Sequence, residues 1–371
     1  MRPTGDPARF KTVDGLRGIA ALAVVCYHLN GAILETYGKW LPGPAAWLLS
    51  HGYLGVDIFF VISGFVIAYS VRNAERSLGF LGRFAVRRSI RLDPPYWAAI
   101  LVEIAVLWAG LRWGLAEAPL PSVRQFLSHF LYLQNILGYG DIINIFWTLC
   151  FEIQFYLGLV LLLLVHRRIE LHFGARSARL LGGLVLAGLF LYSLAVRFEV
   201  FGLSIHPSVA LLRWFQFFLG VCVFWTVSGR ISRAALFALW GAAALTILAR
   251  EQPFYELLPI GVSGLLLWSY QRDQMASLLS NRPLQFLGAI SYSLYLFHST
   301  IGWRLIRATG WALDPRISRL AVVGLFLAGV AICVLIAWLL WLALERPSLR
   351  LSRYVSLTRP GVRGQGSGVR G

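Results

Sequence analysis

The chain of 371 residues is 58% hydrophobic and only 14% charged, and its net charge is +17. With a mean hydropathy of +0.67, this composition excludes a soluble globular protein and is typical of a multi-pass membrane protein. The positive charge therefore indicates contact with membrane lipids, and we expect no nucleic acid partner. The four cysteines have neither metal-ligand nor disulfide-framework spacing, so we expect no metal site.

Ten apolar runs are candidate transmembrane helices. They lie at about residues 14–34, 52–71, 93–111, 145–165, 179–196, 208–227, 232–249, 255–271, 286–305 and 319–343. The eighth is the weakest, because it is short and contains Pro259. A shorter apolar stretch at 126–137 is expected to lie in the membrane interface. We therefore predict an all-α integral membrane protein, a bundle of about ten transmembrane helices.

The basic residues predict the orientation of this bundle. With ten spans both termini lie on one side, and the loops on that side hold 24 Lys and Arg residues against nine on the other side. The positive-inside rule then places both termini in the cytoplasm. We expect a cytoplasmic segment at 1–13, a transmembrane domain at 14–347 and a basic, disordered tail at 348–371. The strong preference for Arg over Lys is typical of a GC-rich bacterial gene, which indicates the plasma membrane of a bacterium.

The first span carries two ionisable residues, Arg17 and His28, which are eleven residues apart. Eleven residues are about three helical turns, so both side chains lie on one helix face. If Arg17 lies at a membrane interface, His28 lies near the midplane, about 16 Å further along the axis. Such a histidine is either satisfied by an interhelical hydrogen bond or faces a functional cavity.

In the second span, Asp57 lies about one turn inside the outer boundary, where a carboxylate needs a partner. Ser63 and Gly64 are small enough to let another helix approach closely. The segment is read either as a packing motif with one capped aspartate or as part of a binding site.

A basic cluster, Arg87, Arg88 and Arg91, precedes the third span. Arg88 and Arg91 share one helix surface, and Pro94 and Pro95 suit the first turn of the following helix. Guanidinium groups bind phosphates bidentately, so the cluster is a candidate phosphate site. The alternative is ordinary positive-inside charge or contact with lipid head groups.

The fourth span places Glu152 about 10 Å below the outer boundary, with Thr148 one turn away. Because the first and fourth spans run in opposite directions, Glu152 and His28 are expected at a similar depth. A carboxylate paired with an imidazole orients it as a base. A purely structural ion pair is the alternative.

In the ninth span, Ser291, Tyr295 and His298 form one polar stripe, with His298 again near the midplane. Two histidines and a glutamate at similar depth indicate a site. Beyond His298, Arg304 and Arg307 lie on the predicted outer side. They are either solvated or form a guanidinium pair that binds an anionic acceptor.

These motifs together resemble acyltransferase family 3, over nearly all of residues 10–347. The resemblance rests on Asp14-Gly-Leu-Arg17 with His28, Gly55-Val-Asp57 through Ser63-Gly-Phe65, Arg87-Arg-x-x-Arg91, Trp147-x-x-x-x-Glu152, Ser291-Tyr-Ser-Leu-Tyr295-Leu-Phe-His298 and Glu345-Arg-Pro347. The usual Trp-Ser-Leu-Ser-x-Glu is here Trp147-Thr-Leu-Cys150-Phe-Glu152. This departure leaves the role of the second hydroxyl in doubt.

The resemblance implies an O-acyltransferase that moves an acyl group, usually acetyl, to a sugar outside the cytoplasm. It implies acyl-CoA as a donor substrate on the cytoplasmic side and no bound cofactor. The donor's phosphates are then expected at Arg17, Arg87, Arg88 and Arg91, and the substrates also contact Asp57, Tyr295 and His298. His28 is expected to accept the acyl group or to deprotonate the acceptor hydroxyl, and Glu152 to orient its imidazole.

Two other classes of function remain open from the residues alone. A carrier of a lipid-linked sugar or small molecule, with no chemistry of its own, also needs buried ionisable residues. A purely structural membrane scaffold leaves the charges near the midplane unexplained.

Overall fold

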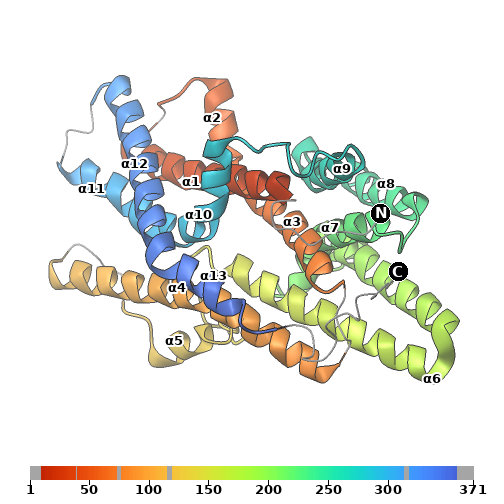
Figure 1. Ribbon diagram of the computed structural model, residues 1–371. Coiled ribbons are helices and arrows are strands. Elements are labelled where there is room, and N and C mark those ends of the chain that lie inside the picture. Colours follow the sequence, from red (N-terminus) through yellow and green to blue (C-terminus); the bar gives the residue numbers. More distant parts are fainter. Residues whose placement is uncertain (1–9, 39, 73–76, 115–118, 313–316, 357–371) are drawn as a thin grey trace, which may run out of the picture.

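The computed structural model describes residues 10–38, 40–72, 77–114, 119–312 and 317–356, and within these ranges it contains helices and no strand (Figure 1). The α-helices are α1 (Lys11–Tyr37), α2 (Gly43–Ser50), α3 (Gly55–Ser70), α4 (Leu78–Arg112), α5 (Val123–His129), α6 (Trp147–Arg197), α7 (Trp214–Val227), α8 (Arg233–Ala249), α9 (Leu258–Gln271), α10 (Arg282–His298), α11 (Arg304–Ala312), α12 (Arg319–Leu340) and α13 (Arg346–Ser352). Short 3-10 turns precede α3, α7 and α9, and π-helical turns lie at Ser299–Trp303 and Trp341–Glu345.

Every predicted apolar run coincides with helix, but fewer helices satisfy the length and apolarity needed to cross a membrane. Within the described ranges, six segments do so: Lys11–Tyr37, Gly43–Ser70, Leu78–Arg112, Trp147–Arg197, Ala210–Val227 and Arg319–Ser352. The chain is therefore an all-helical integral membrane protein. The count of ten spans and the side of the termini stay predictions. Residues 1–9 and 357–371 lie outside the described ranges, and α13 covers the beginning of the predicted tail.

The helix that contains the third predicted span is longer than expected, because α4 begins at Leu78 rather than near residue 93. Its arginines therefore lie on the helix itself, and Pro94 and Pro95 are interior residues instead of first-turn residues. Proline has no backbone N–H, so it cannot donate the helical hydrogen bond to the carbonyl oxygen four residues earlier. Such breaks are tolerated in membrane helices where neighbouring groups replace the lost hydrogen bonds.

The fourth and fifth predicted spans form a helical hairpin within α6. The helix is interrupted at Gly174, whose φ of +81° and ψ of 163° reverse the chain. Glycine tolerates this positive φ because it has no Cβ. The two arms run back along each other, so that a Cβ on Gly182 would lie 2.7 Å from Nδ1 of His166.

The helices form two groups with α1 between them (Figure 1). On one side α3 packs on α7 and α9, and α8 packs on α7. On the other side α10, α11 and α12 pack on α1 and on one another. The first cavity described below lies between α1, α3, α4, α6 and α10, and the second is lined by α1, α3, α6, α10 and the segments just before α3, α6, α7 and α9.

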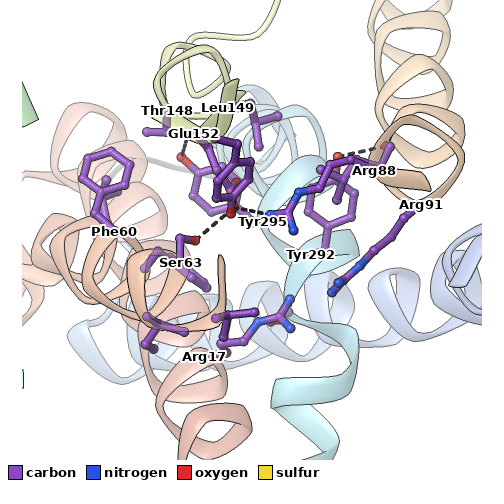
Figure 2. A pocket seen from close by; sticks show the side chains of 17 residues that line it. Arg17, Phe60, Ser63, Arg88, Arg91, Thr148, Leu149, Glu152, Tyr292 and Tyr295 are labelled. Atoms are coloured by element: carbon purple, nitrogen blue, oxygen red, sulfur yellow. Dashed lines mark hydrogen bonds and ion pairs between the residues drawn. The ribbon is translucent and has the colours of Figure 1, made fainter. Parts of the chain in front are cut away.

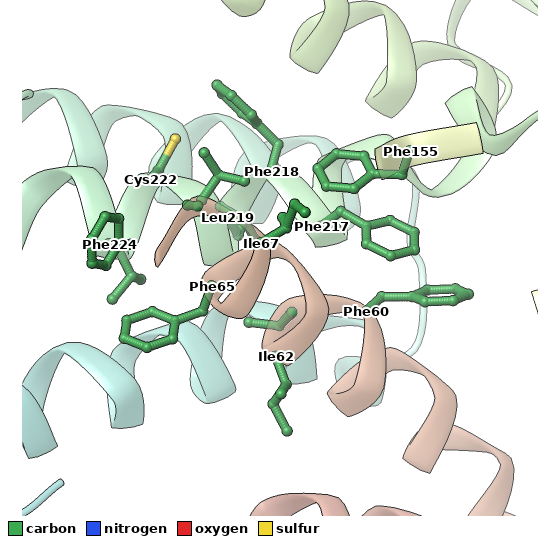
Figure 3. Close-up of a cluster of buried hydrophobic side chains, with 14 of the residues drawn as sticks. Phe60, Ile62, Phe65, Ile67, Phe155, Phe217, Phe218, Leu219, Cys222 and Phe224 are labelled. Atoms are coloured by element: carbon green, nitrogen blue, oxygen red, sulfur yellow. The ribbon is translucent and has the colours of Figure 1, made fainter. Parts of the chain in front are cut away.

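The contact between α3 and α7 is nearly backbone to backbone. A Cβ on Gly64 would lie 1.7 Å from the carbonyl oxygen of Phe217, and one on Gly220 would lie 1.9 Å from that of Val61. Aromatic rings fill the space around this contact, with the Phe60 and Phe217 rings stacked at 4.4 Å (Figure 3). The predicted role of Gly64 in close helix approach is confirmed.

A second contact of this kind joins α1 to α10. A Cβ on Gly288 would lie 2.1 Å from the carbonyl oxygen of Asp14, and one on Gly18 would lie 2.7 Å from that of Leu284. The glycines of the Asp14-Gly-Leu-Arg17-Gly motif thus bring α10 against the helix that carries Arg17 and His28. This contact positions the polar stripe of α10, formed by Ser291, Tyr295 and His298, toward the cavities.

Replacing Gly64 with alanine is expected to destabilise the protein by about 1–3 kcal/mol, because the added methyl group forces α3 and α7 apart. Gly241→Ala in α8 is the matched control, since its Cβ would meet nothing within 4 Å. That change is expected to be neutral or slightly stabilising. Thermal unfolding of both variants in detergent measures the difference; equal stability of the two would contradict the close contact.

Candidate functional site

The first cavity has about 770 Å³ of empty space, including its open mouth, and lies between α1, α3, α4, α6 and α10 (Figure 2). Its charged and hydroxyl-bearing lining residues are Arg17, Ser63, Arg88, Arg91, Thr148, Glu152, Tyr156, Ser291, Tyr292 and Tyr295. Apolar side chains of α3 complete the wall. The sequence motifs of five separate helices therefore converge on one space.

Glu152 is the centre of a hydrogen-bond network in this cavity. Its Oε1 accepts from Ser63 Oγ at 2.9 Å, from Arg88 Nη2 at 3.1 Å and from the hydroxyl of Tyr156. The Arg88 guanidinium also lies over the Tyr156 ring, 3.7 Å from its centroid. The expected pairing of Glu152 with His28 is wrong, because the carboxylate is instead committed to α3, α4 and its own helix.

Two arginines of the same cavity, Arg17 and Arg91, form no ion pair or hydrogen bond with another side chain in the described part of the chain. Figure 2 shows their guanidinium ends directed toward one another across the space below Tyr292. The lining itself holds three arginines and one carboxylate, Glu152, while Asp14 and Glu345 act electrostatically on Arg17 and Arg91 from outside the lining. Arg87 is not among the lining residues, so its predicted place beside the other arginines is not found.

The second cavity, of about 870 Å³, lies further along α1 and contains His28. Its lining residues are Val24, Tyr27, His28, Tyr53, Val56, Asp57, Asn144, Ile145, Trp147, Arg197, Arg213, Glu256 and Tyr295. The order of residues on α1 and α6 fixes the arrangement, since Arg17 and Glu152 line the first cavity while His28 and Trp147 line the second. Arg17 and His28, the two predicted site residues on α1, therefore line two different cavities.

His28 and His298 contact each other through their rings. His298 Nδ1 lies 2.7 Å from the carbonyl oxygen of Tyr295, which only accepts, so Nδ1 carries the hydrogen and Nε2 of the neutral ring is an acceptor. That Nε2 is 3.3 Å from His28 Nδ1, which also lies 3.1 Å from the carbonyl oxygen of Val24. Between two acceptors, His28 Nδ1 carries its hydrogen. The lone pair of His28 is then on Nε2, the nitrogen suited to act as a base or nucleophile.

Val56 and Tyr295 line both cavities and form the wall between them. The Tyr295 hydroxyl is 2.7 Å from Thr148 Oγ1 and 3.2 Å from the carbonyl oxygen of Ile145. Thr148, the altered first hydroxyl of the motif, thus holds this wall in position. Cys150, at the second hydroxyl position, is buried with its Sγ 2.9 Å from Nε2 of Gln134.

Three lining residues of the second cavity, Arg197, Arg213 and Glu256, and the neighbouring Gln216 were missed by the sequence analysis as site residues. Asp57 Oδ1 lies 3.4 Å from Arg213 Nη1 and accepts from Gln216 Nε2 at 2.9 Å. Arg197 Nη2 donates to Glu256 Oε1 at 2.9 Å. An arginine and a glutamine three residues apart in an apolar span share one helix face, and this signal was present in the sequence.

The outer arginine pair predicted at Arg304 and Arg307 is wrong as a feature of this site. Arg304 forms a two-pronged ion pair with Glu103 of α4, and Thr300 Oγ1 donates to the same carboxylate at 2.6 Å. Neither arginine lines either cavity. The contacts of Arg304 and Thr300 with Glu103 instead join the segment after His298 to α4, because a carboxylate on a membrane helix needs a cationic partner.

His129, unlike His28, is a buried histidine whose two ring nitrogens both have hydrogen-bond partners. Its Nδ1 donates to the carbonyl oxygen of Gln125 at 2.7 Å, and its Nε2 accepts from the backbone N–H of Ile142 at 3.1 Å. Burial lowers the pKa of this ring, so that it is neutral at physiological pH. Both of its nitrogens are occupied, whereas Nε2 of His28, which lines the second cavity, has no hydrogen-bond partner in the described ranges.

Comparison with known proteins identifies the family of the chain. A sequence profile of a family described as an acyltransferase domain matches residues 10–341. The chain belongs to acyltransferase family 3. A protein named as a membrane-bound transacylase, BcsY of Komagataeibacter xylinus, is 30% identical over 92% of this chain and 83% of its own. No solved structure matches significantly.

Other relatives in the family are longer than this chain. The peptidoglycan O-acetyltransferase OatA of Listeria monocytogenes is 27% identical over 78% of this chain and 49% of its own. A protein named as a peptidoglycan O-acetyltransferase, YrhL of Bacillus subtilis, is 29% identical over 77% of this chain and 47% of its own. The match thus spans about half the length of these two proteins.

Family membership decides between the classes of function left open by the residues. The chain is an enzyme, an O-acyltransferase, rather than a carrier without chemistry. Its apolar helices and its bacterial membrane-bound relatives indicate a bacterial multi-pass membrane protein.

Proposed function

We propose that this acyltransferase moves an acyl group, in the simplest case acetyl, from cytoplasmic acyl-CoA to a hydroxyl of a sugar acceptor outside the cytoplasm, across the bacterial plasma membrane. One observation carries the proposal. A cationic cavity and a cavity containing His28 lie end to end along α1 and share the wall of Val56 and Tyr295. A donor and an acceptor held on opposite sides of this wall approach one histidine.

The donor belongs in the first cavity because of its charge. Arg17 and Arg91 have no ion-pair partner at contact distance in the described ranges, and phosphates prefer the planar fork of arginine. Arg88 has a different part in this proposal, since it holds Glu152 and the ring of Tyr156. The pantetheine arm then runs past Ser63 and Thr148 toward Tyr295, placing the thioester at the wall.

The chemistry uses the free Nε2 of His28. As a base, it takes the proton of the acceptor hydroxyl while the oxygen attacks the thioester carbonyl, and the CoA thiolate leaves and is protonated. As a nucleophile, the same nitrogen carries the acyl group before the hydroxyl takes it. Both routes need the tautomer that His298 enforces. The names of the relatives, which include peptidoglycan O-acetyltransferases, support a sugar polymer as acceptor.

Arg17→Gln and Arg91→Gln are expected to raise the apparent KM for acyl-CoA roughly ten- to a hundredfold, because each lost charge-assisted contact is worth about 1.5–3 kcal/mol. The effect should shrink with a pantetheine thioester that lacks the nucleotide phosphates. Arg282→Gln, an exposed arginine at the start of α10 that lines neither cavity, is the matched control. Initial rates in proteoliposomes measure all three variants.

Two results would contradict the donor site. Equal losses with acyl-CoA and with the pantetheine thioester would show that the arginines support folding or orientation and do not bind phosphate. A rise in KM for Arg282→Gln as large as that for Arg91→Gln would show a general effect of surface charge. Mass spectrometry of envelope glycans, with and without this chain, then identifies the acetylated acceptor.

A further inference from the structure

We infer that the second cavity is an acceptor subsite built for an uncharged sugar unit, selected by a set of buried ion pairs whose charges cancel. The inference rests on the proposed function, because it places the acceptor hydroxyl at His28. It goes further by naming the residues that hold the acceptor and the charge that the acceptor carries at the reacting unit.

The charges of the second cavity are balanced pair by pair. Arg213 is paired with Asp57 and Arg197 with Glu256, so two cations meet two carboxylates. These side chains are mostly withdrawn from solvent, with Asp57 7% and Glu256 10% exposed. An anionic ligand would have to break such a pair and leave a carboxylate unpaired in a buried place, which is costly.

The first cavity shows that the same protein builds a cationic site when one is needed. There three arginines face a single carboxylate, and two of them have no ion-pair partner in the described ranges. The contrast between the two cavities is therefore a difference in ligand charge. An anionic donor fits the first cavity, and a neutral acceptor fits the second.

The remaining lining of the second cavity suits a sugar ring. Tyr27, Tyr53 and Trp147 offer aromatic faces for its apolar C–H surface. Asn144 and the ion pairs offer donors and acceptors for its hydroxyl groups. An uncharged polyol forms hydrogen bonds to a paired arginine and carboxylate without separating them.

The position of His28 decides which part of the acceptor occupies this space. Its ring lies beside Tyr27, with centroids 5.0 Å apart, and its Nδ1 is occupied by His298 and Val24. A sugar stacked on the aromatic side chains therefore presents a hydroxyl to the remaining nitrogen, Nε2. The sugar unit that reacts is the one enclosed by the neutral cavity, and the inference is that this unit and the units bonded to it carry no charge.

The experiment compares two probes without any acyl donor. Saturation-transfer NMR on the full chain in nanodiscs measures binding of the N-acetylglucosamine tetrasaccharide, which is uncharged. The hyaluronan tetrasaccharide, in which glucuronate alternates with N-acetylglucosamine, is the anionic counterpart. The wild-type protein is expected to bind the uncharged probe at least about tenfold more tightly.

Charge-altering variants then test the cause of this preference. Asp57→Asn leaves the cavity with one excess positive charge and is expected to move the preference toward the anionic probe. Arg213→Gln leaves one excess negative charge and is expected to strengthen the preference for the neutral probe. The double variant restores balance and is expected to return the wild-type ratio. Glu251→Gln, which removes an exposed carboxylate outside the cavity, is expected to change nothing.

Each other outcome overturns the inference. Tighter binding of the hyaluronan probe would make the acceptor anionic, and failure of both probes to bind would exclude a saccharide from this cavity. An unchanged ratio in both single variants would remove the ion pairs from selection. Binding of acyl-CoA to the same nanodiscs is measured separately, so that a failed donor site counts against the proposed function while the saccharide result stands.

Discussion

Replacing His28 with alanine is expected to lower acyl transfer by at least ~10²-fold, the usual effect of removing a catalytic base or nucleophile. The loss should appear in kcat, because the donor's contacts with the first cavity are untouched. His28 is half-buried, and its described ring contacts are with His298, the Tyr27 ring and the carbonyl oxygen of Val24, so the truncation leaves the glycine contacts of α1 intact. Folding and membrane insertion are expected to be normal.

Product formation per folded protein, with folding followed by thermal unfolding, measures this effect. His51→Ala is the control, because that histidine stacks on Trp47 and lines neither cavity. Normal turnover in a well-folded His28→Ala protein would remove His28 from the mechanism. Trapping of a labelled acyl group on wild-type protein but not on the variant would identify the acyl-enzyme route.

His298 is expected to act as a positioning residue, and His298→Leu to lower kcat about 10- to 100-fold with little change in KM for the donor. Without its Nε2 as an acceptor, the His28 ring loses the contact that orients it and keeps the hydrogen on Nδ1. Losses of this size are typical when the partner that orients a functional histidine is removed. Steady-state kinetics over a pH series measures both constants and the pH profile.

His298→Gln separates this role from simple packing. The amide oxygen of glutamine accepts a hydrogen bond from His28 Nδ1, so the variant is expected to recover part of the lost kcat and a wild-type pH profile. Equal defects in the leucine and glutamine variants, with an unchanged pH profile, would show that His298 only fills space. A large rise in donor KM would place it in the donor site instead.

Helix periodicity predicted well which parts of the chain are helical and which residues share a helix face, because apolar run length and residue spacing are local properties. It placed Arg17 and His28 on one face and grouped Ser291, Tyr295 and His298, and the structure brings these residues to the two cavities. Helix periodicity did not predict which helices lie side by side. Depth alone matched Glu152 with His28, whereas the packing of α4 puts Arg88 beside Glu152 and the packing of α10 puts His298 beside His28.

The missed ion pairs have the same explanation. Arg197 and Glu256 lie at the end of α6 and in the turn before α9, and no local pattern joins positions so far apart. Arg213 and Gln216 did carry a local signal, but their partner Asp57 is 156 residues from Arg213 in the chain. The helix contacts that bring such residues together depend on glycines such as Gly64, whose neighbour cannot be read from its own sequence context.

The wall of Val56 and Tyr295 has a consequence for the membrane as an electrical barrier. An open pore through the protein would dissipate the ion gradients that a bacterial plasma membrane maintains. Under the proposed function, the donor fills one chamber and the acceptor fills the other, each from its own side of the membrane, with these side chains between them. The acyl group then passes one way, and the hydroxyl proton that His28 takes up passes the other way to the CoA thiolate, so no net charge crosses the transmembrane field. The transfer is therefore electrically silent and needs no gate that opens to both sides.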